Sequence, residues 1–460
     1  VLFIIPIVLF FKKSSFLFSK FNRKESYTLL FLLVISFSYS SFMINCVNPN
    51  SNNSFYSLMN NVNMPRLNVE NFGLLESSII SVKRSLFGFK EKKYVSEDIL
   101  NNKRSILSNS DNVKYNEEDI DFNTLISNEK DSNIRSLHEY FSNQTPTEQN
   151  SYTGIFKGKN LIFIVAESFD EIAIDKTLTP TLYKLKTEGI KFNNYFAPKY
   201  PASTADGEYM LEWGILPIIG ENYSLIDMVY NTNPYILPRE FKSMNYNTYV
   251  YHDYFGYYNY RKKYFSTLNF DGMRYCQDGI DMYCDHFHGS DVDMMNQTIG
   301  DYINKEHFFT YYITLSGHGS YDSTNFVAEK HLSKLNGYNY SSNIKYYMAA
   351  NIDFDIAMEN LVSSLEKNNR LDDTVIVISS DHSPYYLTNE QVNTRSSIDR
   401  TNNFDRNRGS LIIYNSKLKG NHSIDKVAMN IDVLPTLLNM FGISYDSRLM
   451  IGKDIMADNN

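Results

Sequence analysis

Three segments of the sequence contain residue types that can bind a metal ion or act as a nucleophile. Glu167 follows the apolar run NLIFIVA, and the pair Asp381 and His382 follows the apolar run VIVISS. Thr204 lies in the small-residue segment PASTADGEYM. Carboxylates and an imidazole are metal ligands, and a threonine hydroxyl can attack an electrophilic centre. Together they form the minimum set for metal-assisted transfer of a phosphoryl or related group.

These residues lie in a region of alternating strands and helices that begins near residue 158. LIFIVA at 161–166 and TVIVISS at 374–380 are continuous apolar runs, typical of strands buried on both faces. The segment 179–189 begins with Thr-Pro and ends in Gly, as a helix does. We expect further strands at KFNNYFA, TYVYH, HFFTYYITL and SLIIY, and further helices at STADGEYMLEWG, 291–304, 343–368 and DVLPTLLNMFG. This order predicts an α/β fold, a mostly parallel central sheet with helices on both faces.

The candidate residues share one position relative to the predicted strands. Ligands of open parallel sheets bind at the carboxyl ends of the strands. Six candidates directly follow a predicted strand or lie within a few residues of its end: Glu167, His252, Asp253, His318, Asp381 and His382. A lone glutamate can also cap a helix, an Asp-His pair can form a hydrogen-bonded turn, and Thr204 can be an N-cap. The shared edge of the sheet favours a metal site over these separate structural roles.

The beginning of the chain has the composition of a membrane region. Residues 1–11 are apolar, and residues 27–44 carry no charge over 18 positions, enough to cross a hydrocarbon core of about 30 Å. The basic loop between them favours a cytoplasmic location, which places the residues after 45 outside the cell. A signal peptide cleaved near Ser41 is the alternative, although it does not explain the apolar run before the basic loop. We expect a cell-membrane protein, multi-pass in its full-length form, with an extracellular catalytic domain.

Three regions are predicted along the chain. Residues 1–45 form a transmembrane region that starts without a methionine and is expected to be truncated. Residues 46–157 form an extracellular helical connector, and residues 158–460 form the catalytic domain. Within the connector, apolar side chains recur at helical spacing in two places, at Leu75, Ile79, Val82 and Leu86, and at Ile134, Leu137 and Phe141.

Charge and cysteine content limit the classes of partner. The formal net charge of -8 excludes a nucleic-acid partner, because no basic stripe is present to neutralise phosphates. Only three cysteines occur. Cys276 and Cys284 lie close together in the sequence and in an expected oxidising compartment, so the sequence leaves open whether they form a disulfide.

The order of the motifs resembles the extracellular domain of lipoteichoic acid synthases, in the sulfatase-like branch of the alkaline phosphatase superfamily. The shared motifs are Glu-Ser-Phe at 167–169, the small-residue segment around Thr204, His-Asp at 252–253 with a downstream arginine, Gly-His-Gly at 317–319, and Asp-His at 381–382. GSLIIYN and IDVLPTLLNMFGI resemble the closing strand and helix of that superfamily. The resemblance covers residues 158 to 460, and its specificity comes from the number and order of short motifs.

The resemblance implies one divalent cation, commonly Mn²⁺ in this family, with Zn²⁺ or Mg²⁺ as the other ions that fit such ligands. The implied ligands are Glu167, Thr204, Asp381 and His382, with Thr204 also the catalytic nucleophile.

The resemblance also implies a second catalytic residue and a set of substrate contacts. His318 would exchange protons with the leaving or entering alcohol, and His252, Asp253 and Arg261 would contact the donor. The family has a Trp-Asn-Arg run where this chain reads YNYR at 258–261, and a solvated arginine in the RKK cluster is the alternative for Arg261.

The implied reaction moves glycerolphosphate from phosphatidylglycerol to a lipoteichoic-acid-type polymer or glycolipid through a phospho-threonine intermediate. Donor and acceptor would be lipid partners in the outer leaflet of the membrane. Two alternatives stay open: a phosphoethanolamine transferase, which shares the chemistry and topology, and a catalytically inactive envelope-binding relative. A sulfatase is disfavoured, because Thr204 is followed by Ala-Asp-Gly instead of standing as the Cys or Ser of a Cys/Ser-x-Pro-x-Arg motif.

Overall fold

The computed structural model describes residues 113–217, 233–418 and 422–459, a helical segment at 77–85, and a few single residues between these ranges. The chain divides into two compact units, Val1–Lys103 and Arg104–Asn460. Among the described residues, no helix is both long and apolar enough to cross a membrane. The predicted spans at 1–11 and 27–44 lie outside the described residues, so the membrane region stays a prediction. The helix predicted around Ile79 and Val82 is present at 77–85.

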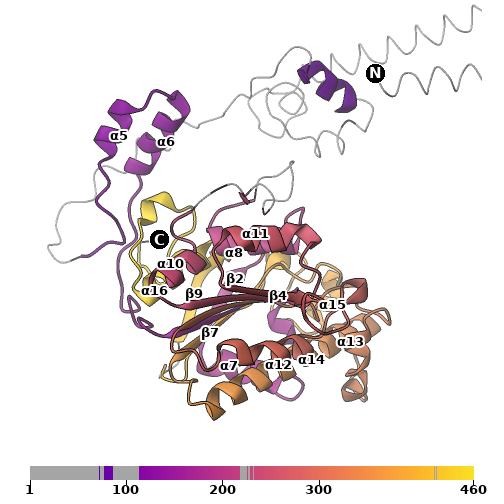
Figure 1. The fold of residues 1–460 in the computed structure, drawn as a ribbon. Coiled ribbons are helices and arrows are strands. Elements are labelled where there is room, and N and C mark those ends of the chain that lie inside the picture. Colours follow the sequence, from indigo (N-terminus) through magenta and orange to yellow (C-terminus); the bar gives the residue numbers. More distant parts are fainter. Residues whose placement is uncertain are drawn as a thin grey trace, which may run out of the picture. The chain divides into compact units, whose positions relative to one another are not determined.

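One sheet of nine strands forms the centre of the second unit, in the order β5-β4-β3-β6-β1-β7-β8-β2-β9 (Figure 1). The strands are β1 Asn160–Ala166, β2 Ile190–Phe196, β3 Asn247–His252, β4 Gly272–Cys276, β5 Gly279–Ile280, β6 Phe308–Ile313, β7 Thr374–Ser380, β8 Leu411–Tyr414 and β9 His422–Met429. Every pairing is parallel except those of β8, which runs antiparallel to both β7 and β2. The mostly parallel sheet predicted from the sequence is therefore confirmed.

Helices cover both faces of this sheet, as predicted (Figure 1). One face carries α7 Pro180–Glu188, α12 Asp291–Tyr302, α13 Phe326–Glu329, α14 Ser342–Lys367 and α15 Asn389–Asn393. The other carries α8 Thr204–Trp213, α10 Leu237–Ser243, α11 Arg261–Thr267 and α16 Asn430–Phe441. Two hydrophobic clusters result, because alternate residues of β1 point to opposite faces: Phe163 belongs to one cluster and Ile164 to the other.

The continuous apolar runs explain why the central strands lie where they do. Every residue of β1, β6 and β7 is buried, which is the environment expected for parallel strands covered on both faces. Burying each Ile, Leu, Val or Phe side chain contributes roughly 1.5–3 kcal/mol. These three adjacent strands therefore form a fully buried centre of the sheet, which holds the residues at their ends in place.

The segment before the predicted catalytic domain packs on the end of the chain. It contains α5 Phe122–Asn128 and α6 Ser132–Ser142, the second of which was predicted from its apolar spacing. Its backbone donates hydrogen bonds from Gly154 to the carbonyl of Asn439 and from Phe156 to that of Met440, both at 2.9 Å.

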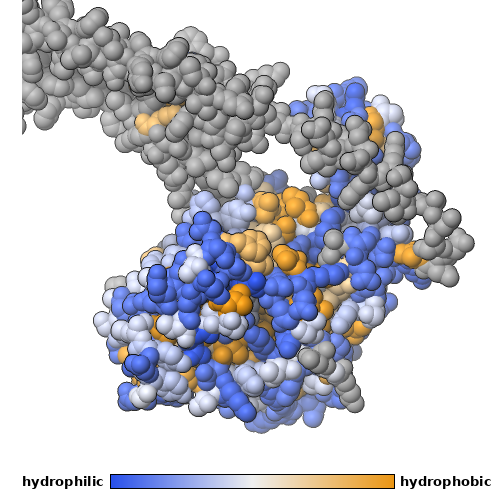
Figure 2. Space-filling view, turned by 180° about the vertical axis from the view of Figure 1, so that it is seen from behind, coloured by the Kyte–Doolittle hydropathy of each residue, from blue (hydrophilic) through white to orange (hydrophobic). Residues whose placement is uncertain are grey.

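Figure 2 shows a largely hydrophilic surface with apolar side chains in separate patches. The domain boundary at 157/158 stays a prediction.

Candidate active site

The ends of two neighbouring strands bring the predicted metal ligands together. β1 and β7 pair in parallel with Ala166 opposite Ser380, so the next residue of each strand, Glu167 and Asp381, lies at the same edge of the sheet. His382 follows directly. One ligand atom from each of Glu167, Asp381 and His382 lies within 4.8 Å of the others, and we call these three residues the metal triad. In the part of the chain that the structure describes, no other His, Cys, Asp and Glu residues form such a group.

Helix α8 brings Thr204 to this triad. Thr204 is the first residue of the helix, and its Oγ1 donates a hydrogen bond to Glu167 Oε2 at 2.8 Å. The same oxygen lies 3.5 Å from His382 Nε2. Gly207 permits this approach, because a Cβ at that position would lie 2.4 Å from the backbone oxygen of Asp381. The four residues predicted from the sequence thus meet in space.

Hydrogen bonds orient each triad member toward a common centre. Asp381 Oδ1 accepts from the backbone N–H groups of Ser168 at 2.8 Å and His382 at 2.6 Å, whereas Oδ2 is buried and accepts no hydrogen bond. His382 Nδ1 lies 3.1 Å from the carbonyl oxygen of Ser383, so Nδ1 carries the hydrogen and Nε2 presents its lone pair. The Oδ2 atom of Asp381 and the Nε2 lone pair of His382 therefore lie 3.2 Å apart, and Nε2 also lies 3.5 Å from Thr204 Oγ1.

The electrostatics of the triad are those of a cation site. Burial, and then the charge of Glu167, raise the pKa of Asp381 well above its usual value. Burial raises the pKa of Glu167 as well, but the imidazoles of His382 and His318 and two hydroxyl donors outweigh it, so that this pKa is lowered. Burial lowers the pKa of His382 although the charge of Glu167 opposes this, a shift in the direction of the neutral imidazole that binds a metal. A divalent ion would offset the repulsion between the two carboxylates, and this donor set suits Mn²⁺, Mg²⁺ or Zn²⁺.

Two serines next to the triad adopt an unusual backbone conformation. Ser168, directly after Glu167, has φ 52°, and Ser203, directly before Thr204, has φ 49° and ψ -117°. Residues other than glycine rarely occupy such regions, and they cluster at functional sites where the surrounding structure holds them. Ser168 is held by its bonds to the triad, because its Oγ donates to Glu167 Oε1 at 2.7 Å.

Thr204 opens into a cleft of about 260 Å³. The cleft is lined by Pro201, Ala202, Ser203, Thr204, His252, Tyr254, Tyr258, Asn259, Arg261, Phe287, Leu315, His318, Tyr385 and Tyr386. His318 stacks on Phe287 with ring centroids 5.5 Å apart, and its Nδ1 lies in hydrogen-bond contact with the carbonyl oxygen of Gly319. Four of the predicted catalytic or substrate residues, Thr204, His318, His252 and Arg261, thus share one cavity.

His252 and Asp253 differ in their relation to the cleft, although they are adjacent in sequence. His252 Nδ1 donates to the carbonyl of Ile313 at 3.0 Å, and its buried Nε2 has no hydrogen-bond partner and belongs to the cleft lining. Burial lowers the pKa of His252 well below its usual value, so Nε2 is an acceptor. Asp253 is fully buried and is not part of the lining, and its Oδ1 lies 3.6 Å from His252 Nδ1. Burial and the carboxylate of Asp291 raise the pKa of Asp253 well above its usual value.

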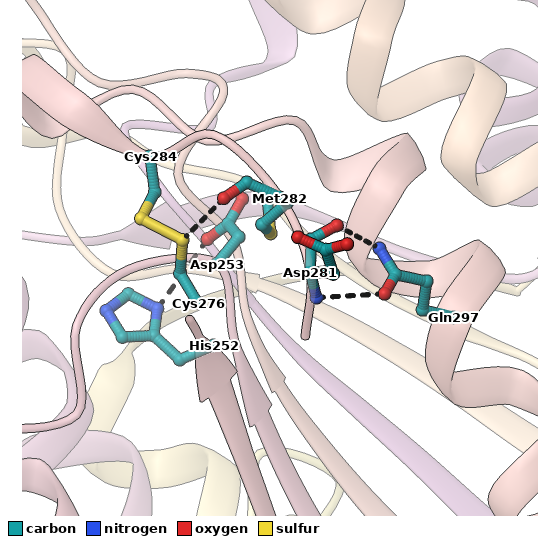
Figure 3. The surroundings of a disulfide bond; sticks show 7 residues. All are labelled: His252, Asp253, Cys276, Asp281, Met282, Cys284 and Gln297. Carbon is teal, nitrogen blue, oxygen red and sulfur yellow. Dashed lines mark hydrogen bonds and ion pairs between the residues drawn. A yellow bond between two sulfur atoms is a disulfide. The ribbon is translucent and has the colours of Figure 1, made fainter. Parts of the chain in front are cut away.

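A disulfide joins Cys276 and Cys284 beside this pair (Figure 3). The sequence left this pairing open, and the structure forms it across a separation of 8 residues. Cys276 Sγ lies 3.3 Å from the carbonyl oxygen of Met282. The bond closes the loop that leads to Phe287, one of the residues that line the cleft.

Arg261 is not the solvated arginine that was its alternative. Its side chain is 2% exposed, and its Nε donates to both carboxylate oxygens of Glu208, at 3.0 and 3.1 Å. Sequence reasoning missed Glu208, although one signal was present: it lies four residues after Thr204 on the same predicted helix, hence on the same face. Ser168 was also missed, and its serine type alone gave no sign of its role.

A nine-stranded, mostly parallel sheet with helices on both faces and a carboxylate–imidazole triad at the carboxyl ends of its strands defines an alkaline-phosphatase-like α/β protein. The crystal structure of the lipoteichoic acid synthase LtaP from Listeria monocytogenes has this fold, with a TM-score of 0.58 at 21% identity, covering 70% of this chain and 81% of LtaP. A protein of the alkaline phosphatase superfamily from Vibrio parahaemolyticus matches with a TM-score of 0.51 at 18% identity, covering 67% and 72% of the two chains.

Residues 159–443 match the family model described as Sulfatase, and the chain belongs to that family. Lipoteichoic acid synthase 2 of Bacillus subtilis (strain 168) is 26% identical over 362 residues, which cover 71% of this chain and 51% of that protein. The lipoteichoic acid synthase of Staphylococcus saprophyticus is 29% identical over 342 residues, covering 69% and 50%. The chain spans about half the length of the curated relatives it matches. These matches confirm the family resemblance seen in the motifs.

Proposed function

We propose that this protein is a metal-dependent, membrane-anchored transferase that moves glycerolphosphate from phosphatidylglycerol to a lipoteichoic-acid-type polymer or glycolipid through an intermediate on Thr204. One observation carries the proposal: Thr204 Oγ1 lies 2.8 Å from Glu167 Oε2, beside a buried triad in which Asp381 Oδ2 accepts no hydrogen bond. The names of the curated relatives supply the substrate class.

The first half of the reaction cleaves the donor. Thr204 Oγ attacks the phosphorus, the bond between phosphorus and the diacylglycerol oxygen breaks, and diacylglycerol leaves with a proton from His318. The Thr204 hydroxyl gives its proton to Glu167 Oε2, which accepts its hydrogen bond. The positive end of helix α8 favours the anionic phosphorus at this position.

The second half transfers the glycerolphosphate group to the acceptor. The acceptor hydroxyl gives its proton to His318 and attacks the same phosphorus, and the Thr204 oxygen leaves and regains a proton. Glu167, Asp381, His382 and Thr204 would hold the cation, Mn²⁺ in the first place and Zn²⁺ or Mg²⁺ as alternatives. When bound, the ion would acidify the Thr204 hydroxyl and offset charge on the phosphoryl oxygens.

The partners and location follow from the substrates. A phospholipid donor and a lipid-linked acceptor would both lie in the outer leaflet, and a membrane anchor raises their local concentration near the cleft. A phosphoethanolamine transferase is the second candidate, because it shares this metal–threonine chemistry and outward topology, and the Cys276–Cys284 disulfide fits the oxidising compartment in which it would act.

The test supplies fluorescent phosphatidylglycerol to the full chain in detergent with Mn²⁺ and measures diacylglycerol. We expect product from the wild type and a loss of at least about 1,000-fold in Thr204→Ala, because the nucleophile is removed. Release of diacylglycerol from phosphatidylethanolamine and not from phosphatidylglycerol would establish the second candidate instead. Absence of product from both lipids in a metal-loaded protein would favour the inactive relative.

A further inference from the structure

One buried carboxylate connects the helix of the nucleophile to the arginine of the cleft. Glu208 lies one turn after Thr204 on α8, and Arg261 is the first residue of α11. The Glu208 carboxylate accepts hydrogen bonds from Nε and Nη2 of Arg261. Glu208 is 0% exposed, so solvent and salt weaken this ion pair much less than an ion pair at the surface.

The pairing determines which part of the guanidinium is left for a ligand. Glu208 occupies the edge formed by Nε and Nη2, which is the edge that most often grips a carboxylate or phosphate. Among the described residues none accepts a hydrogen bond from Nη1, and Arg261 lines the cleft beside Thr204. A phosphate oxygen in the cleft would therefore meet the Nη1 end of the group.

We propose that Glu208 is the positioning residue that holds the Arg261 guanidinium at the phosphate subsite, in fixed relation to Thr204 on the same helix. The inference rests on the proposed function, because it assigns Arg261 to the phosphate of the donor. Nucleophile and guanidinium then move as one unit, and reacting groups must be held within a fraction of an ångström for efficient attack.

The local sequence alone does not hold the start of α11. Asn259 and Tyr260 have φ values of 52° and 58°, and no side chain caps the helix. Two successive left-handed residues are costly outside glycine, so contacts from elsewhere must stabilise the turn. The ion pair between the Glu208 carboxylate and Arg261 is such a contact, and Arg261 is the residue that Glu208 would position.

A neighbouring acid on α8 provides a matched control. Glu212 lies one turn further, accepts a hydrogen bond from Tyr264 of α11, and Tyr264 in turn accepts from Trp213 Nε1 at 2.6 Å. Burial raises the pKa of Glu212 well above its usual value, in the direction of the neutral carboxyl. Glu212→Gln leaves the ion pair between Glu208 and Arg261 in place, whereas Glu208→Gln removes the partner of Arg261.

The experiment uses the full chain loaded with Mn²⁺ and measures inorganic phosphate binding by calorimetry together with turnover of phosphatidylglycerol. We expect Glu208→Gln to weaken phosphate binding and to lower kcat/KM by up to about 100-fold, the effect of displacing a positioned group by about 1 Å. Glu212→Gln should stay within about threefold of the wild type. Mn²⁺ affinity should be unchanged in both variants, since neither side chain belongs to the metal triad.

A double-mutant cycle separates positioning from folding. If Glu208 acts through Arg261, then Glu208→Gln combined with Arg261→Gln should have the kcat/KM of Arg261→Gln alone. Additive losses, or equal effects of Glu208→Gln and Glu212→Gln, would overturn the inference. If Glu208→Gln does not fold, Glu208→Asp keeps the charge on a shorter side chain, and wild-type phosphate affinity in that variant would overturn the inference too. Failure of the wild type to cleave phosphatidylglycerol while phosphate binding still depends on Glu208 would count against the proposed function alone.

Discussion

The active site has two parts, the metal triad and part of the cleft lining, which we call its two walls, and they are built in different ways. The metal triad follows directly from the ends of β1 and β7, which pair in parallel at the centre of the sheet and are buried along their whole length. The second wall, which we call the α11 wall, consists of His252, Arg261 and Phe287. These residues come from the end of β3, the start of α11 and a 3₁₀ turn at 285–287.

The difference lies in what fixes the geometry of each wall. Hydrogen-bond register between two strands places Glu167 beside Asp381, and it cannot shift by one residue without turning buried side chains to the other face. The α11 wall depends on two specific contacts, a long-range ion pair to Glu208 and a local disulfide. Changes in the triad should therefore act on metal binding, and changes that loosen the α11 wall should act on substrate binding.

The largest expected effect is the loss of metal in Asp381→Asn. The substitution removes the charge of the carboxylate whose Oδ2 is buried without a hydrogen-bond donor. We expect Mn²⁺ affinity to fall by more than about 100-fold, because loss of an outer-shell partner alone costs 10- to 100-fold. Metal content after dialysis and competition with a chelator measure the effect. Asp355→Asn, a buried carboxylate on α14, is the control, and an equal loss of metal there would contradict the assignment.

The next effect should come from Gly207→Ala, which tests the packing between the nucleophile helix and the triad. The new Cβ would lie 2.4 Å from the Asp381 backbone oxygen, so α8 must move away from β7. A shift of about 1 Å in Thr204 should lower kcat by about 100-fold.

Gly300→Ala in α12 is the matched control for this helix substitution, since nothing lies within 4 Å of a Cβ there. It should raise stability by roughly 0.5–1 kcal/mol and leave kcat unchanged. Equal kcat values in Gly207→Ala and the wild type would show that Thr204 does not need its present distance from the triad.

A smaller effect should follow from replacing both Cys276 and Cys284 by serine. Opening a loop of 8 residues' separation should lower the free energy of unfolding by roughly 2–3 kcal/mol in the chain-entropy account. Because this loop leads to Phe287, we also expect a higher KM for phosphatidylglycerol with little change in Mn²⁺ affinity. Thermal melting measures the stability, steady-state kinetics measure KM, and metal titration measures the Mn²⁺ affinity. A loss of Mn²⁺ affinity with an unchanged KM would contradict the proposed difference between the two walls.

The same contrast explains what the sequence could predict. The strands that hold the triad are continuous apolar runs, which indicate burial on both faces of the sheet. The residues directly after these runs are therefore predicted to lie at the edge of the sheet, and no other information is needed. Strand β9 was missed because it lies at the edge of the sheet and its residues alternate in exposure, so HSIDKVAM has no apolar run. β4 was missed because its first three residues are only partly buried and GMRYC has no apolar run, and β5 was missed because it has two residues.

The α11 wall was only partly predictable, because its contacts join distant positions. Arg261 and Glu208 are 53 residues apart, and neither residue type identifies the other as its partner. The family resemblance implied that both His252 and Asp253 contact substrate, yet only His252 lines the cleft. The order of the predicted strands indicates at which edge of the sheet a site lies. The direction of each side chain at that edge depends on the local backbone where its strand ends, and the order of the strands does not predict it.

The smallest expected effect belongs to the scaffold and should leave both walls intact. Asp355 on α14 accepts a hydrogen bond from the backbone N–H of Leu182 in α7, a helix whose N-cap Thr179 makes no side-chain cap. Burial raises the pKa of Asp355 to about 6, above the value of about 3.9 in an unfolded chain. The folded state therefore holds this proton more tightly, and its contribution to stability is full below about pH 4 and is lost as the pH rises to about 6.

Asp355→Asn should remove this pH dependence. The amide oxygen can still accept from Leu182, and no charge is buried at pH 7. The difference in unfolding free energy between variant and wild type should change by on the order of 2 kcal/mol between pH 4 and pH 7, in favour of the variant at the higher pH. Denaturant unfolding at several pH values measures that difference. A difference that does not vary with pH would show that folding does not raise the pKa of Asp355 and that its role is only to accept the hydrogen bond at the start of α7.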